Sequence, residues 1–373
     1  MVPEARIAGG AVRDWLAERP VADIDMAVPL RPEAVLRRLE EGGIRAVPTG
    51  LEHGTVTAVL DKKSFEITSL RRDVETDGRH AVVEFTDDWE ADAARRDFTI
   101  NAMSMDRNRR IFDYFSGQDD LRAGRVRFVG EAARRIAEDY LRILRYFRFF
   151  ARYARGEPDA EAVAAISAQK QGLSLISAER IWSELKRILA APDPRRALGL
   201  MQATSVLASV LPEGADSARF ARMVERGAPA EPLLRMAALL AGDADVMASR
   251  LRLSEAERTR LAALRAAPAL PPDADEAALR QALADEEPDL LIARAWLADD
   301  GKDRAGLRGR IAASPRPVFP LKGRDGLELG IAPGPALGAA LAATRRWWLD
   351  GGCVADREAC LSHLAGLAGI STR

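Results

Sequence analysis

The chain has 373 residues, enough for two or three domains, and its 47% hydrophobic and 30% charged content is that of a globular protein. Its formal net charge of −1 excludes nucleic-acid binding through overall charge, so any such affinity must come from local basic faces. Two cysteines, Cys353 and Cys360, are too few for a disulfide framework, and no apolar run approaches membrane-spanning length. We therefore expect a cytoplasmic protein that does not contact a membrane.

Residues 7–128 mix helical and strand patterns, and the first feature in them is Gly9-Gly10 followed by Arg13. Adjacent glycines let the backbone approach a ligand closely, and an arginine can donate two parallel hydrogen bonds to a phosphate. A short helix over residues 11–18 is expected to follow.

Asp23 and Asp25 lie at the start of a predicted strand over residues 24–28. Alternate residues of a strand point to the same face, so the two carboxylates are expected to converge. Two carboxylates suit Mg²⁺, because the rest of its coordination shell stays free for water and phosphate oxygens. An Asp-x-Asp pair is also common at exposed strand ends, and the pair alone leaves both interpretations open.

The next segment predicts a helix over residues 32–41 and then a hairpin with strands over residues 55–60 and 64–70. Glu66 in the second strand is either a third carboxylate beside the Asp pair or an ordinary solvent-facing residue. Residues 73–80 are polar and have no period, which predicts a loop.

Arg95, Arg96 and Asp97 follow one another in the next polar segment. Such a triplet commonly forms a surface ion pair. Alternatively, Asp97 holds an arginine in the geometry that neutralises a phosphate.

From residue 131 the pattern becomes continuously helical, and a helix over residues 137–155 would carry apolar residues on one side and arginines on the other. These arginines are Arg142, Arg145, Arg148, Arg152 and Arg155. A basic face is usually just solvated, but five like charges this close repel unless an anion is bound. Asp139 and Arg142, one turn apart, could read a base edge, because a carboxylate accepts from an amino group and a guanidinium donates to a ring nitrogen.

The chain resembles the class II tRNA nucleotidyltransferase and bacterial poly(A) polymerase family, within the polymerase β-like nucleotidyltransferases. The matching segments, in family order, are residues 9–14 with 23–25, 65–71, 92–103, 138–142 and 177–185. Tyr140 stands where many members have proline, but Asp139 and Arg142 on either side match the family motif.

The resemblance implies an α+β fold in which a nucleotidyltransferase head with a mixed β-sheet precedes an all-α neck, body and tail. The implied domains are the catalytic head over residues 1–130, the nucleotide-selecting neck over 131–200 and the tRNA-binding body and tail over 201–373. The function it favours is template-independent addition of C, C and A to tRNA 3′ ends from CTP and ATP, with Mg²⁺ as cofactor. A poly(A) polymerase, an A-adding enzyme and a catalytically silent RNA-binding protein are the alternatives.

The resemblance also assigns roles to individual residues. Asp23 and Asp25 would hold Mg²⁺, and Glu66 would be a further catalytic acid. Asp139 and Arg142 would select C or A. The full set of implied nucleotide-binding residues is Gly9, Gly10, Arg13, Arg95, Arg96, Asp97, Asp139, Arg142, Arg145 and Arg148.

Overall fold

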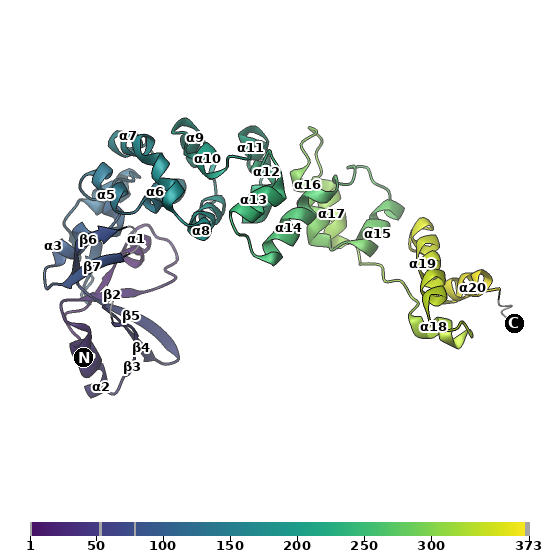
Figure 1. Ribbon diagram of the computed structural model, residues 1–373, viewed down its shortest axis with the longest axis horizontal. Coiled ribbons are helices and arrows are strands. Elements are labelled where there is room, and N and C mark those ends of the chain that lie inside the picture. The colour runs from purple at the N-terminus through teal and green to yellow at the C-terminus, as the bar shows by residue number, and fades with distance from the viewer. Residues whose placement is uncertain (1, 52–53, 78–79, 370–373) are drawn as a thin grey trace. The chain divides into compact units, whose positions relative to one another are not determined.

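The computed structural model describes residues 2–51, 54–77 and 80–369 (Figure 1). The chain forms two compact units. The first unit comprises Met1–Ser217, Ala230–Pro232 and Leu240–Leu253. The second comprises Ala218–Pro229, Leu233–Leu239 and Ser254–Arg373. The α+β fold predicted from the sequence is confirmed, because a mixed sheet forms in the N-terminal part and helices follow it.

The sheet of the first unit has the strand order β3-β4-β5-β2-β1-β8-β9. Its strands are β1 (Arg6–Ala8), β2 (Asp25–Val28), β3 (Arg45–Gly50), β4 (Thr55–Leu60), β5 (Lys63–Ser69), β8 (Met103–Met105) and β9 (Ile111–Asp113). β2 and β5 are parallel and the other neighbours are antiparallel. The parallel pair sets residues near 25 and 66 side by side.

The β4–β5 hairpin has the predicted position and a two-residue turn at Asp61 and Lys62, both with positive φ. Such turns match the right-handed twist of the flanking strands. Helix α2 (Pro32–Glu41) covers this end of the sheet, where its Val35 packs in a core cluster with Val56 and Ile67.

The loop predicted over residues 73–80 is wrong. The backbone instead forms β6 (Arg71–Asp77) and β7 (His80–Phe85), which pair antiparallel in a separate two-stranded sheet, while residues 78–79 lie outside the described chain. A two-stranded ribbon has little core face to impose an alternation of apolar residues, so the sequence pattern gave no strand signal there.

The rest of the head consists of short elements around the sheet. They are α1 (Gly10–Leu16), α3 (Trp89–Ala94), the 3₁₀ helix η2 (Thr99–Asn101) and α4 (Gly117–Ala123). Phe98, just before η2, packs with its ring centroid 4.8 Å from that of Phe128, and Phe128 stacks on Tyr146 at 5.9 Å. This aromatic core joins the head to the helix that carries Tyr146.

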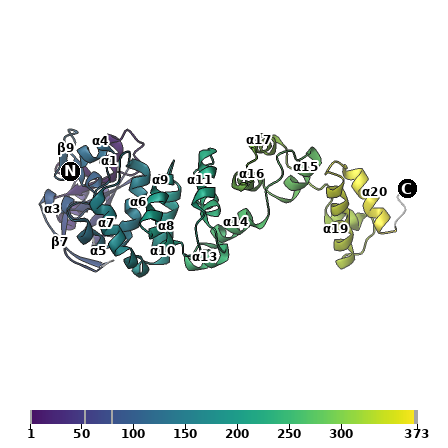
Figure 2. The same cartoon turned by 90° about the horizontal axis from the view of Figure 1, so that it is seen from above.

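The helix predicted over residues 137–155 is interrupted. Helix α5 (Ala132–Glu138) ends at Asp139, whose φ of −157° and ψ of 106° are extended, and α6 (Leu141–Tyr153) begins two residues later. α6 packs against α8 and α9, and Figure 2 shows these helices side by side. The remaining helices of this unit are α7 (Ala160–Gln169), η3 (Lys170–Leu175), α8 (Ala178–Leu189), α9 (Arg195–Ala203), α10 (Val206–Val210) and α13 (Ala244–Arg250).

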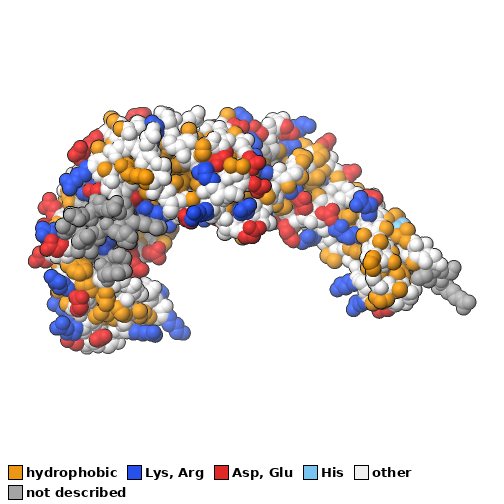
Figure 3. Space-filling model, viewed as in Figure 1, with side chains coloured by type: hydrophobic (Ala, Val, Ile, Leu, Met, Phe, Trp, Pro, Cys, Tyr) orange, Lys and Arg blue, Asp and Glu red, His pale blue; other side chains and the backbone are white. Residues whose placement is uncertain are grey.

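The second unit is helical, with core clusters around Leu279 and Trp348. Its helices are α11 (Ser217–Glu225), α12 (Pro232–Leu239), α14 (Glu255–Ala266), α15 (Glu276–Asp285), α16 (Pro288–Leu297), α17 (Ala305–Ala313), α18 (Gly323–Glu328), α19 (Pro335–Asp350) and α20 (Arg357–Leu367). Among the described residues, none of the helices combines the length and apolar character needed to span a bilayer. Figure 3 shows acidic, basic and hydrophobic side chains interspersed over the visible face.

Candidate active site

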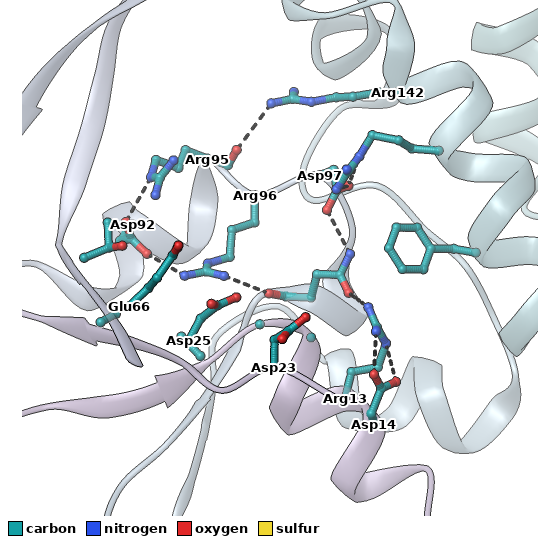
Figure 4. Close-up of a pocket in the computed structure, with 18 of the residues that line it drawn as sticks. Arg13, Asp14, Asp23, Asp25, Glu66, Asp92, Arg95, Arg96, Asp97 and Arg142 are labelled. Carbon is teal, nitrogen blue, oxygen red and sulfur yellow. Dashed lines mark hydrogen bonds and ion pairs between the residues drawn. The ribbon is translucent and has the colours of Figure 1, made fainter. Parts of the chain in front are cut away.

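A cavity of about 970 Å³ opens in the first unit, between the sheet and helices α6 and α8 (Figure 4). Every site residue named from the sequence lines it. These residues are Gly9, Gly10, Arg13, Asp23, Asp25, Glu66, Arg95, Arg96, Asp97, Asp139, Arg142, Arg145 and Arg148. The fold therefore brings together residues that lie up to 139 positions apart in the chain.

Three carboxylates lie on the sheet side of the cavity. Asp25 is the first residue of β2 and is in register with Glu66 of parallel β5, while Asp23 precedes the strand in irregular backbone. All three residues are exposed, and within the described part of the chain none of their carboxylate groups has a hydrogen bond or ion pair. Glu66 is thus beside Asp25, as the resemblance implied.

These carboxylates fit a divalent cation bound partly by the protein. The described residues hold no cluster of three or more Asp, Glu, His or Cys side chains close enough to enclose a metal. Mg²⁺ rarely uses such a cage, because it keeps waters and substrate phosphates in its shell and needs only one or two carboxylates. Asp23 and Asp25, exposed and unpaired, meet that requirement.

Arg13 is held rigidly at the edge of the cavity by two neighbours. Its Nε and Nη2 donate to the two carboxylate oxygens of Asp14 at 3.0 and 2.9 Å, and its Nη1 donates to Asn101 Oδ1 at 2.5 Å. Tyr153 donates its hydroxyl proton to Asp14 as well. Three of the five N–H groups of Arg13 are used, which leaves two for an anion.

The glycine before α1 is required by close packing. Gly9 has a φ of 70°, and a Cβ atom built on it would lie 2.7 Å from Nη1 of Arg96. Any larger residue would strain the backbone at this positive φ and force the end of the Arg96 side chain to shift.

Two buried aspartates hold the arginines that face the sheet. Asp92, 3% exposed, accepts hydrogen bonds from Arg95 Nε at 2.9 Å and from Arg96 Nη2 at 3.2 Å. Burial opposes ionisation of Asp92, but the charges of Arg95 and Arg96 outweigh it and hold the pKa of this carboxyl below its ordinary value. Asp92 thus keeps both guanidinium groups in place at the cavity wall.

Asp97 binds an arginine of another element. It is 7% exposed and accepts hydrogen bonds from Nε and Nη2 of Arg145 on α6, and from Asn101 Nδ2 at 2.9 Å. Burial would raise its pKa, but the Arg145 charge and these hydrogen bonds hold the pKa below its ordinary value. Asp97 therefore orients an arginine, as expected, and that arginine is Arg145 rather than its neighbours in the sequence.

Arg142 and Arg148 of α6, like Arg145, are paired with acids from other elements. Arg142 Nη1 donates to Glu138 Oε2 at 2.5 Å, and Arg148 Nη1 donates to Glu184 Oε1 of α8 at 3.1 Å. Burial lowers the pKa of Arg148 to about 10, against the opposing charge of Glu184, so this residue remains cationic at neutral pH. The predicted like-charge repulsion is relieved by these acids.

The basic face predicted on this helix does not extend to its last arginine. Arg152 lines the cavity, but Arg155 follows the end of α6 and donates from Nη2 to the carbonyl oxygens of Leu121 and Arg122. Because the helix begins at Leu141 and ends at Tyr153, the assumed periodicity does not reach Arg155.

Sequence reasoning did not select several residues that shape this cavity. They are Asp14, Asp92, Asn101, Glu138, Arg180 and Glu184. All six lie within the segments that match the family, and only that membership could have pointed to them.

Two family models match the chain. The model of the poly(A) polymerase head domain matches residues 5–127, and the model described as the probable RNA and SrmB-binding site of polymerase A matches residues 157–217. The first range covers the sheet and the two buried aspartates, and the second covers α7 to α10.

Similar proteins match over nearly the whole chain. The mitochondrial CCA tRNA nucleotidyltransferases 1 of Mus musculus and Homo sapiens are each 38% identical over 97% of this chain and 86% of their own length. The solved CCA-adding enzyme of Bacillus stearothermophilus in complex with CTP is 28% identical and covers 98% of this chain and 93% of its own, with a TM-score of 0.76.

Proposed function

The chain belongs to the family of CCA tRNA nucleotidyltransferases, and on this basis we propose that it adds C, C and A to tRNA 3′ ends from CTP and ATP, releasing pyrophosphate. The observation that carries the proposal is one cavity that joins unpaired carboxylates, fixed arginines and a side-chain pair suited to a base edge. A catalytically silent RNA-binding protein would not require this combination.

The arginines of the cavity bind the triphosphate in this proposal. Arg13, held by Asp14 and Asn101, presents its remaining N–H groups to phosphate oxygens. Arg95 and Arg96, fixed by Asp92, face the charge that develops as pyrophosphate leaves. Because their orientations are set before the nucleotide arrives, little reorganisation is needed during the reaction.

Asp23 and Asp25 would hold Mg²⁺, and Glu66 lies beside Asp25 where it can orient the tRNA 3′-hydroxyl or accept its proton. The ion, when bound, supplies Lewis-acid activation of the hydroxyl and neutralisation of phosphate charge. The carboxylates place the 3′-hydroxyl opposite the arginines, so that the α-phosphate lies between them.

Asp139 and Arg142 select the base by hydrogen-bond polarity. Cytosine and adenine each present an amino donor next to a ring-nitrogen acceptor, which matches a carboxylate beside a guanidinium. Uracil and guanine present a carbonyl oxygen next to an N–H at the same positions, so both contacts would be mismatched. Two of the four nucleotides are thereby accepted without a nucleic-acid template.

The proposed division of labour follows the domains expected from the sequence. Residues 1–130 carry out the chemistry, residues 131–200 select the nucleotide, and residues 201–373 bind the tRNA. We place the protein in the cytoplasm, although the similar mammalian enzymes are named as mitochondrial.

The test is incubation of the full chain with Mg²⁺ and a tRNA that lacks its terminal CCA, supplied with CTP, ATP or both, followed by sequencing of the 3′ ends. We expect two C to be added with CTP alone, and a single terminal A to follow them when ATP is also present. Growing A tails would instead assign a poly(A) polymerase, one A added only to tRNA ending in CC would assign an A-adding enzyme, and no extension would favour the silent RNA binder.

A further inference from the structure

The Asp139 carboxylate is held at both of its oxygen atoms. Oδ1 accepts a hydrogen bond from the backbone N–H of Leu141 at 3.1 Å, and Oδ2 accepts one from Nη2 of Arg180 at 2.7 Å. The side chains of Asp139 and Arg180 are 21% and 26% exposed, so the pair is partly shielded from water. The last torsion of an aspartate is broad, and two contacts on opposite oxygens are needed to fix the plane of the carboxylate.

The partner of Asp139 in base selection is held in a similar way. Arg142 Nη1 donates to Glu138 Oε2 at 2.5 Å and to the carbonyl oxygen of Arg135 at 2.9 Å, and Nη2 donates to the carbonyl oxygen of Arg95 at 3.5 Å. Three of its five N–H groups are thus used. The Nε–H and one Nη2–H group remain for acceptors on a base.

The position of Arg180 is unfavourable for its own helix. It is the third residue of α8, where the positive end of the helix dipole disfavours a cation. Its guanidinium reaches Asp139, which lies at the break between α5 and α6. The contact with Asp139 therefore accounts for a cation at a site that helix formation alone would not select.

We propose that Arg180 is a specificity-determining positioning residue, which fixes the plane of the Asp139 carboxylate so that it accepts the amino group of C or A. The inference rests on the proposed function and deepens it, because it assigns base discrimination partly to a residue of α8. Without Arg180 the carboxylate is tethered by Oδ1 alone and can turn away from the amino group. Uracil and guanine gain nothing from that orientation, so their incorporation does not depend on Arg180.

The experiment compares Arg180→Met, Arg180→Lys and the control Lys186→Met, which removes a cation from the same helix outside the cavity. The kcat/KM for CTP and for UTP is measured on tRNA lacking CCA, and circular dichroism verifies folding of each variant. Arg180→Met is expected to lower the CTP-to-UTP ratio by about 10-fold or more, since one well-placed base contact discriminates by roughly that factor. Arg180→Lys retains a single donor and should recover part of the ratio, and Lys186→Met should leave it unchanged.

A double-mutant cycle with Asp139→Ala separates positioning from structural support. If Arg180 acts through Asp139, Arg180→Met changes the CTP-to-UTP ratio no further when Asp139 is absent. Equal losses with CTP and UTP, or an unchanged ratio in Arg180→Met, would overturn the inference. The wild-type protein in the same assay tests the proposed function separately, because its failure to extend tRNA would count against the function itself.

Discussion

Three carboxylates of the cavity have no arginine or lysine partner among the described residues: those of Asp23, Asp25 and Glu66. Asp14, Asp92, Asp97 and Asp139 each have an arginine partner. Acids that are exposed and unpaired contribute little to stability, so they can be replaced without unfolding the chain. This contrast allows catalytic and structural roles to be separated experimentally.

Asp25→Asn is therefore expected to lower the rate of CMP addition by about 1,000-fold or more, a loss of roughly 4 kcal/mol of transition-state stabilisation. The melting temperature should stay within about 1 °C of the wild type, because Asp25 has no ion pair with any residue that the structure describes. Initial rates on tRNA lacking CCA and thermal unfolding are the measurements. The matched control, Asp61→Asn in the β4–β5 turn, should keep the full rate; a fast Asp25→Asn enzyme would contradict the assigned role.

Asp97, in contrast, is buried and paired with Arg145. Asp97→Asn is expected to destabilise the fold by about 3 kcal/mol at pH 7, because it leaves Arg145 without its buried partner. The pKa of Asp97 is held below its ordinary value of 3.8, so its ionised form stabilises the native state. That contribution is complete above about pH 4 and is lost as the pH falls through the lower native pKa. Urea unfolding at pH 7, 5, 4 and 3 measures it.

The difference in unfolding free energy between wild type and Asp97→Asn should accordingly shrink below about pH 4. Asp119→Asn is the control, since the Asp119–Arg122 pair has both side chains 71% exposed and should contribute less than about 1 kcal/mol. If the difference in unfolding free energy between wild type and Asp97→Asn stayed constant down to pH 3, the charge of the Asp97 carboxylate would not be what stabilises the fold.

Among the elements, the break between α5 and α6 depends on the short helix η3. A Cβ atom added to Gly172 of η3 would lie 2.1 Å from the ring of Tyr140, which stands between Asp139 and Leu141. A side chain at position 172 would therefore force the Tyr140 ring, next to Asp139, to shift. The packing of η3 against Tyr140 thus lies next to Asp139, one of the two residues proposed to select the base.

Gly172→Ala should raise the KM for CTP by about 10-fold and destabilise the fold by about 1–3 kcal/mol, because the added methyl group displaces Tyr140. Steady-state kinetics and thermal unfolding check both effects. Gly199→Ala in α9 is the control: its Cβ would meet nothing within 4 Å, and alanine in a helix should stabilise by up to about 1 kcal/mol. Unchanged kinetics in Gly172→Ala would mean that Tyr140 does not transmit the displacement.

The elements with strong local signals were predictable from the sequence. Helix α2 begins and ends at the expected residues, and the strands of the β4–β5 hairpin lie within one residue of their expected bounds. The register of Asp25 with Glu66 was not predictable from spacing, because parallel pairing joins segments separated by a helix and two strands. The interruption at Asp139 was missed since apolar periodicity continues on both sides of it.

The partners of the site residues were harder to predict than the site residues themselves. Segment resemblance placed Arg145 in the cavity, but no pattern linked it to Asp97, 48 residues away. Arg180 lies in a segment that matches the family, but its contact with Asp139 exists only after α8 packs on α6 and could not be inferred from that segment. Ion pairs between distant elements leave no trace in local spacing.

For the whole molecule, a net charge of −1 means that tRNA must be attracted by particular basic surfaces rather than by overall charge. Affinity for tRNA should still fall steeply with salt, by on the order of 100-fold or more between 50 and 200 mM, because each phosphate contact releases counterions. Filter binding across this range tests it, with CTP binding as the comparison. A flat salt response for tRNA would argue against phosphate-dominated docking.

The cations that line the described cavity are all arginines, and the six lysines of the chain lie elsewhere. A guanidinium stays protonated at any pH a cell reaches, and it does not react with acetyl donors as an amine does. The lining of this cavity is therefore out of reach of lysine acetylation, whether enzymatic or spontaneous. Dicarbonyl reagents that attack guanidinium groups should abolish CTP binding, and bound CTP should protect these arginines from modification.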